Sequence, residues 1–142
     1  MMPTKLGRGG ECGKPQALAR FAHAQKFLDV AELVASEAAD GIDPASASVA
    51  AALAILAGIA ASDAACCLVL NKRSRGESHA QAADFLRTIT GGGKAADALS
   101  ELNSLKDTAH YGVINISSKE LKVAMRRATT LVDFAQSLFD AA

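Results

Sequence analysis

The sequence predicts an all-α protein, an antiparallel up-and-down four-helix bundle with one additional short helix. Apolar residues recur at helical spacing in five segments, and no segment alternates convincingly between apolar and polar residues as a strand would. Hydrophobic residues make up 50% of the chain, yet only 4% are aromatic and Trp is absent. This composition favours Ala and Leu packing between helices over a β-sandwich. The length of 142 residues is typical of one domain with a buried core.

The glycine-rich residues 1–13 are expected to form a flexible N-terminal tail, and residues 14–142 a single helical-bundle domain. The first helix is predicted to begin near Pro15, because proline suits the first turn of a helix. Gly41 is expected to end it, after an apolar stripe made of Leu18, Phe21, Leu28, Ala31, Val34 and Ala38.

The second helix is predicted from Pro44 to Leu70, with Asp43 as its N-cap. Residues 49–70 contain a single charged side chain, Asp63. A segment this long and apolar meets the length criterion for a membrane helix, about 20 residues. Its high Ala content and its embedded carboxylate favour the central helix of a bundle, surrounded by other helices. No membrane partner is therefore expected.

The middle of the chain predicts two further helices. Residues 71–78 form a basic connector, followed by a short third helix over residues 79–89. Three glycines at positions 91–93 should then interrupt helical structure. The fourth helix is predicted from about Lys94 to His110, with Gly112 ending it.

The last helix has the clearest start signal in the sequence. Ser117 and Glu120 fit a capping box, in which each side chain accepts a hydrogen bond from the backbone N–H of the other residue. The helical period then continues through Leu121, Ala124, Met125, Ala128, Leu131, Val132, Ala135, Leu138 and Phe139.

The charges of the chain balance, with 15 acidic and 15 basic residues. Any binding of nucleic acid should therefore depend on local basic patches and not on the field of the whole molecule. No metal site and no cofactor are predicted, because His23, His79 and His110 are scattered and no His, Cys and carboxylate residues cluster at ligand spacing.

The three cysteines, Cys12, Cys66 and Cys67, are odd in number and form no CxxC pair. Cys66 and Cys67 are adjacent in the apolar helix, where they are expected to act as small buried hydrophobes. No signal-peptide pattern is recognised near the N-terminus. These observations favour a reducing, cytoplasmic location.

Asp63 is the most informative single residue. Removing a carboxylate from water is costly unless the group is paired or protonated. Asp63 is therefore expected either to accept from a hydroxyl or a lysine on a neighbouring helix, as a structural residue, or to face a wet cleft, as a functional one.

A candidate site can be assembled around Asp63. Lys106 and His110 are four residues apart on the fourth helix and so share a face, and Tyr111 follows. Together with Asp63 and His79, they are expected to line one cleft able to transfer protons or hold a phosphate. Structural alternatives remain open: His110 suits the negative end of a helix dipole, Lys106 a solvated face, and Tyr111 the core.

Three stretches of the chain resemble HEPN domains, the nucleotide-associated helical bundles. They are the apolar helix with its Ala61-Ser62-Asp63-Ala64 segment, the connector from Arg73 to His79, and the segment from Leu105 to Gly112 before the capped final helix. The resemblance covers about residue 17 to the C-terminus. It implies a four-helix up-and-down core that often pairs into a homodimer, and active members of the family cut RNA without a metal.

The resemblance also bears on individual residues. In active members, an Arg, a polar residue and a His near the end of the third long helix meet their dimer mates in a cleft. His110 corresponds to that histidine by its place before the last connector. No arginine stands at the expected spacing, and the nearest base is Lys106, which lacks the planar fork that grips a phosphate.

Two functions follow from these patterns. The preferred one is an HEPN-like dimer without strong catalysis that binds a nucleotide, RNA or a partner protein, such as a nucleotidyltransferase or an antitoxin. Its expected ligand-binding residues are Asp63, Arg73, Arg75, His79 and Tyr111.

The alternative is a metal-independent endoribonuclease. In it, His110 is the general acid or base, and Lys106, with Arg73 or Arg75, stabilises phosphate charge.

Overall fold

The computed structural model describes residues 10–36, 43–74, 79–111 and 115–142, with the side chains of residues 79 and 107–111 excepted. The described chain is almost entirely helical, which confirms the all-α class. Its elements, in order, are β1 (Gly10–Glu11), α1 (Lys14–Ser36), α2 (Pro44–Leu70), β2 (Lys72–Arg73), α3 (His79–Arg87), α4 (Gly93–Tyr111) and α5 (Ser118–Ala141).

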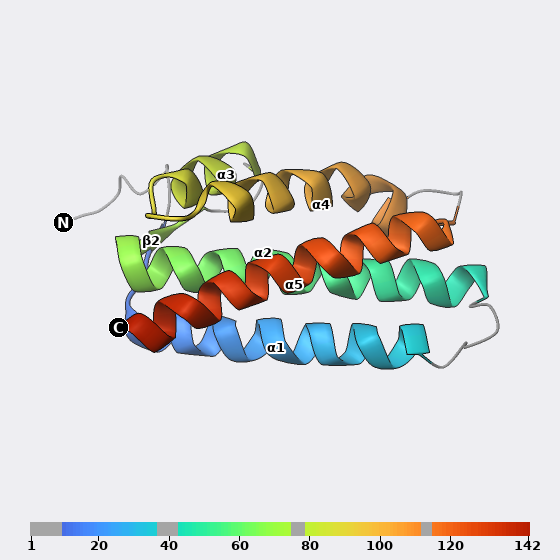
Figure 1. The fold of residues 1–142 in the computed structure, drawn as a ribbon, viewed down its shortest axis with the longest axis horizontal. Helices are drawn as coiled ribbons and strands as arrows, with labels where there is room; N and C mark the ends of the chain where they lie inside the picture. Colours follow the sequence, from blue (N-terminus) through green and yellow to red (C-terminus); the bar gives the residue numbers. More distant parts are fainter. Residues whose placement is uncertain (1–9, 37–42, 75–78, 112–114) are drawn as a thin grey trace.

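The four long helices, α1, α2, α4 and α5, lie along the long axis of the molecule, and successive ones run in opposite directions (Figure 1). The short helix α3 packs beside the beginning of α4. Helix α2 contacts all four other helices, so it is the centre of the fold. Helices α1 and α5 also meet directly, where the rings of Phe21 and Phe139 lie 5.0 Å apart.

Small side chains explain why the other helices can approach α2 so closely. Its buried residues are mostly alanines, and Gly58 lies among them. A Cβ atom at Gly58 would clash with the side chain of Leu102 on α4 and lie 3.1 Å from Leu131 Cδ1 on α5. The absence of a side chain at Gly58 therefore allows α2, α4 and α5 to meet at one point.

Among the described residues, α2 is the one helix long and apolar enough to cross a membrane. In this structure, 67% of its most apolar window is buried inside the protein. The central helix of a bundle has the same length and composition, and its burial here agrees with the expectation that neighbouring helices surround it.

Both predicted N-terminal caps are present. The Asp43 carboxylate accepts from the Ser46 backbone N–H at 2.9 Å, immediately before Pro44. At α5, the Ser117 hydroxyl accepts from the Glu120 N–H at 3.1 Å, and the Glu120 carboxylate accepts from the Ser117 N–H at 2.9 Å. This reciprocal pair is the capping box expected from the sequence.

The α3–α4 connection differs slightly from the prediction, since α3 ends at Arg87 and not at residue 89. Ile89 instead donates a turn hydrogen bond to the carbonyl of Leu86. Gly91 has a φ of +80°, and a Cβ at Gly92 would overlap the Leu86 carbonyl oxygen. The predicted helix ends at Gly41 and Gly112 lie outside the described residues.

The largest differences from the sequence analysis are at the N-terminus. Residues 10–13 are not a loose tail: β1 pairs antiparallel with β2, and Cys12 forms a disulfide with Cys67. Cys67 was expected to be a simple buried hydrophobe, and that expectation was wrong. Cys66 is the buried free thiol that was expected. Two-residue strands have no detectable period, and a disulfide between cysteines 55 positions apart leaves no local signal.

Candidate functional site

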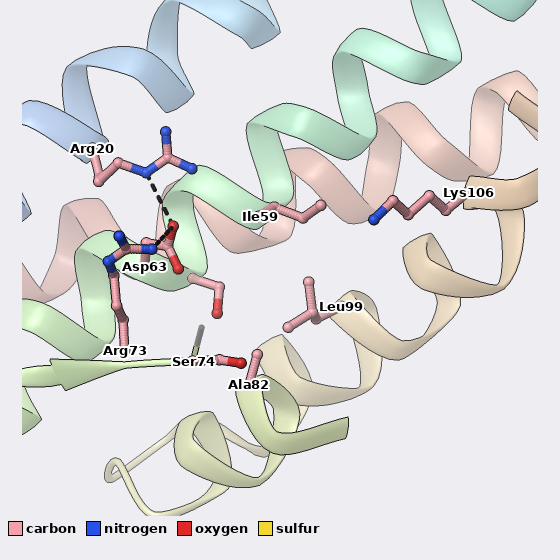
Figure 2. A pocket seen from close by; sticks show the side chains of 9 residues that line it. Arg20, Ile59, Asp63, Arg73, Ser74, Ala82, Leu99 and Lys106 are labelled. Atoms are coloured by element: carbon pink, nitrogen blue, oxygen red, sulfur yellow. Dashed lines mark hydrogen bonds and ion pairs between the residues drawn. The ribbon is translucent and has the colours of Figure 1, made fainter. Parts of the chain in front are cut away.

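A pocket of about 230 Å³ opens where α1, α2, α3, α4 and β2 come together. Ile59, Ala82 and Leu99 supply apolar walls. The polar residues that line it are Arg20, Ser62, Asp63, Arg73, Ser74 and Lys106 (Figure 2). Three of these side chains are cationic and one is anionic, so the pocket carries an excess of positive charge.

Asp63 is buried in the second half of α2, with 7% of its surface exposed. Its Oδ2 atom accepts a hydrogen bond from Arg20 Nε at 3.0 Å and lies 3.6 Å from Arg73 Nη1. The expected structural partner was a hydroxyl or a lysine. The structure instead gives Asp63 two arginines, one from the first helix and one from β2.

Burial and the neighbouring positive charges shift the pKa of the Asp63 carboxyl in opposite directions. Loss of water raises the pKa of the Asp63 carboxyl, while the Arg20 and Arg73 guanidinium groups oppose that rise. Burial is the larger effect, so the net pKa shift is upward. The two arginines therefore offset only part of the desolvation of this carboxylate.

Arg20 is the residue of this site that the sequence analysis missed. It lies on α1, is partly exposed, and brings Nη1 within 3.2 Å of His23 Nδ1. In the structure, Arg20 lies on the same helical face as the fully buried Ala17 and Ala24. A charged residue between two core positions requires a partner, and Asp63 supplies it, but the burial of these positions could not be read from the sequence.

Arg73 was predicted as a ligand-binding residue, and the structure places it at the pocket. It belongs to β2, where its neighbour Lys72 lies over the ring of Phe85 on α3, 4.8 Å from the ring centroid. Strand β2 thus connects the Asp63 ion pair to α3, which forms another wall of the pocket. Arg75 lies outside the described residues.

Lys106 reaches the same pocket from α4, as the sequence analysis expected for Asp63 and Lys106. Leu99 stands two turns earlier on that face of α4 and lines the pocket with it. In Figure 2 the Lys106 ammonium points toward Ile59, at the opposite end of the pocket from Arg20 and Arg73.

The remaining predicted site residues are located only by their backbone. His79 is the first residue of α3, and its side chain lies outside the described residues. His110 and Tyr111 are the last two residues of α4, and their side chains also lie outside what the structure describes. Their place in the cleft therefore stays a prediction.

In the part of the chain that the structure describes, no group of three or more His, Cys, Asp and Glu side chains could hold a metal ion. The cationic groups of the pocket suit an anion instead. Guanidinium groups bind phosphate and carboxylate oxygens through paired N–H donors, and an ammonium adds a point charge.

Searches against protein-family models, curated proteins and solved structures return no match for this chain. The HEPN interpretation stays a prediction from the residues that resemble that family.

Proposed function

We propose that this protein is a binding module whose Arg20–Arg73–Lys106 pocket holds the phosphate groups of a nucleotide or RNA, without strong catalysis. The observation that carries the proposal is the set of three cationic side chains from three different elements around one pocket with a single carboxylate. The whole chain has 15 acidic and 15 basic residues, so this excess of positive charge belongs to the pocket and not to the molecule as a whole.

The arginines retain donors for a ligand after pairing with Asp63. A guanidinium carries five N–H donors. The contacts described above engage Nε and Nη1 of Arg20 and Nη1 of Arg73. Asp63 holds the guanidinium groups of Arg20 and Arg73 in place from a buried position. A ligand therefore loses less binding free energy to the ordering of these two side chains.

The wider proposal is an HEPN-like four-helix bundle that acts as a homodimer, with a nucleotidyltransferase or an antitoxin as its protein partner and no membrane partner. The reducing, cytoplasmic location expected from the cysteines stays a prediction, and the Cys12–Cys67 disulfide argues against it. The four long helices run in alternating directions, and this supports the bundle part of the proposal. The resemblance of the segments around Asp63, Arg73 and His110 supports the family part.

The second candidate is a metal-independent endoribonuclease. The specific observation in its favour is that Lys106 lines the pocket and that His110 follows one turn later on α4. His110 would move a proton on or off the 2′-hydroxyl or the leaving oxygen, and Lys106 would stabilise phosphate charge. Lys106 lacks the bidentate fork of arginine, so binding without cleavage is the preferred proposal.

Binding is tested with a fluorescently labelled single-stranded RNA oligonucleotide and anisotropy titration. Arg73→Gln should weaken the affinity about tenfold or more, because a hydrogen bond to a charged group contributes roughly 1.5–3 kcal/mol. Lys122→Gln is the matched control, since it removes one positive charge from an exposed position on α5 outside the pocket. Equal affinities for the two variants would overturn the proposal.

Cleavage is tested separately by incubating the protein with tRNA in EDTA beside His110→Ala. Intact tRNA with both proteins is expected for a binding module. Cleavage by the wild type alone would establish the endoribonuclease in its place.

A further inference from the structure

The Cys12–Cys67 disulfide joins the N-terminal segment to the end of α2, one turn after Asp63. Cys67 is fully buried, whereas Cys12 is partly exposed. The disulfide therefore lies between a fixed residue in the core and a short segment at the surface.

That short segment is connected directly to the candidate pocket. In the antiparallel pairing of β1 with β2, Gly10 stands opposite Arg73 and Glu11 opposite Lys72. The Cys12 backbone N–H also donates to the Asn71 carbonyl at 3.1 Å. Cys12 is thus the covalent anchor of the strand that holds Arg73 in place.

We propose that the Cys12–Cys67 disulfide is a redox latch, which keeps Arg73 at the pocket when oxidised and weakens phosphate binding when a dithiol reductant opens it. The inference rests on the proposed phosphate-binding function and adds a regulation of that same site. Its distinguishing consequence is that the oxidation state of two cysteines outside the pocket sets the affinity of the pocket.

The redox step is a thiol–disulfide exchange. A thiolate of the reductant attacks Sγ of Cys12, the more exposed of the two residues, and the bond to Cys67 breaks, so Cys67 leaves as a thiolate and takes up a proton. The second thiol of the reductant then attacks the mixed disulfide and releases Cys12 as a thiol. Two electrons and two protons pass to the protein, and the reductant becomes a disulfide.

Cys66 stands beside Cys67 but does not compete in this exchange. Burial, with a smaller effect from the Asp63 charge, raises the pKa of the Cys66 thiol to about 12. A thiol with so high a pKa stays protonated near neutral pH and is a poor nucleophile. Because Cys66 is also buried, we expect the latch to have two states, oxidised and reduced, without a rearranged disulfide.

After reduction, little remains to hold β1 against β2. Each strand has two residues, and so short a pair is marginal in water without further support. Strand β2 keeps the contact of Lys72 with the Phe85 ring. We therefore expect Arg73 to become more mobile but to stay near the pocket, so that the affinity falls without being abolished.

The test compares four samples of the full chain: oxidised wild type, wild type in dithiothreitol, Cys12→Ser and the control Cys66→Ala. Reduction should weaken binding of the labelled RNA oligonucleotide severalfold, and Cys12→Ser should match the reduced wild type and not respond to dithiothreitol. Cys66→Ala should keep the full difference between its oxidised and reduced forms. Amide hydrogen exchange gives a ligand-free readout. On reduction it should quicken more at Cys12 and Arg73 than at amides of α4 and α5, which report the general loss of stability when the cross-link opens.

The two readouts separate failure of the latch from failure of the proposed function. An oxidised protein that binds no RNA, yet exchanges faster at Arg73 when reduced, would overturn the binding function and keep the latch. Unchanged exchange at Cys12 and Arg73 on reduction would overturn the latch, whatever the affinity. Binding that is equal in the oxidised and reduced forms would overturn the regulation.

Discussion

Loss of the Cys12–Cys67 disulfide should destabilise the protein substantially. The two cysteines are 55 positions apart. In the chain-entropy model, closing a loop of that length removes about 14 cal/mol/K from the unfolded state, or about 4 kcal/mol at room temperature. Cys12→Ser should therefore lower the free energy of unfolding by about 4 kcal/mol. With an unfolding entropy of about 0.3 kcal/mol/K for 142 residues, Tm should fall by about 14 °C.

The measurement is urea unfolding followed by far-ultraviolet circular dichroism, together with a thermal scan. Wild type in dithiothreitol should match Cys12→Ser, because both lack the same cross-link. Cys66→Ala keeps the cross-link and should lose only about 1 kcal/mol, through lost packing in the core. A loss below about 1 kcal/mol for Cys12→Ser would refute the reasoning, since it would mean that the disulfide does not constrain the unfolded chain.

Two further predictions concern the α3–α4 turn and Asp63. Gly92→Ala should destabilise the protein by about 2–4 kcal/mol because its Cβ would overlap a backbone carbonyl, whereas Gly93→Ala, with nothing within 4 Å, should be neutral or stabilising in the same urea assay. Burial raises the pKa of Asp63 above 3.8, so the folded state binds this proton more tightly and wild type should gain stability over Asp63→Asn as pH falls toward 3.8. A loss of wild-type stability relative to Asp63→Asn as the pH falls would show that the arginines affect the pKa of Asp63 more than desolvation does.

Local signals account for the parts of the fold that were predicted well. Asp43 before Pro44, and Ser117 with Glu120, each place a cap and a helix start within a few residues of sequence. The start of α2 and the capping box of α5 could be found for that reason. The helical period then extends each prediction along its helix.

The candidate site was only partly predictable, because its pairs join distant segments. Asp63, Arg73 and Lys106 were singled out by an unusual charge or a helical spacing, and the structure brings them to one pocket. Arg20 was missed because its partner is 43 residues away and only the packing of α1 on α2 brings them together. The pairing of Cys12 depends on the same kind of long-range contact.

The alanine content of α2 has a consequence for how the protein folds. Alanine has no side-chain torsion to immobilise, so ordering this central helix carries almost no loss of rotamer entropy. Alanine side chains also have no flexible end that could move aside for a larger neighbouring residue. Ala54, Ala57 and Ala61 are buried almost completely, so an added methyl group there would have to be accommodated by shifts in the surrounding helices.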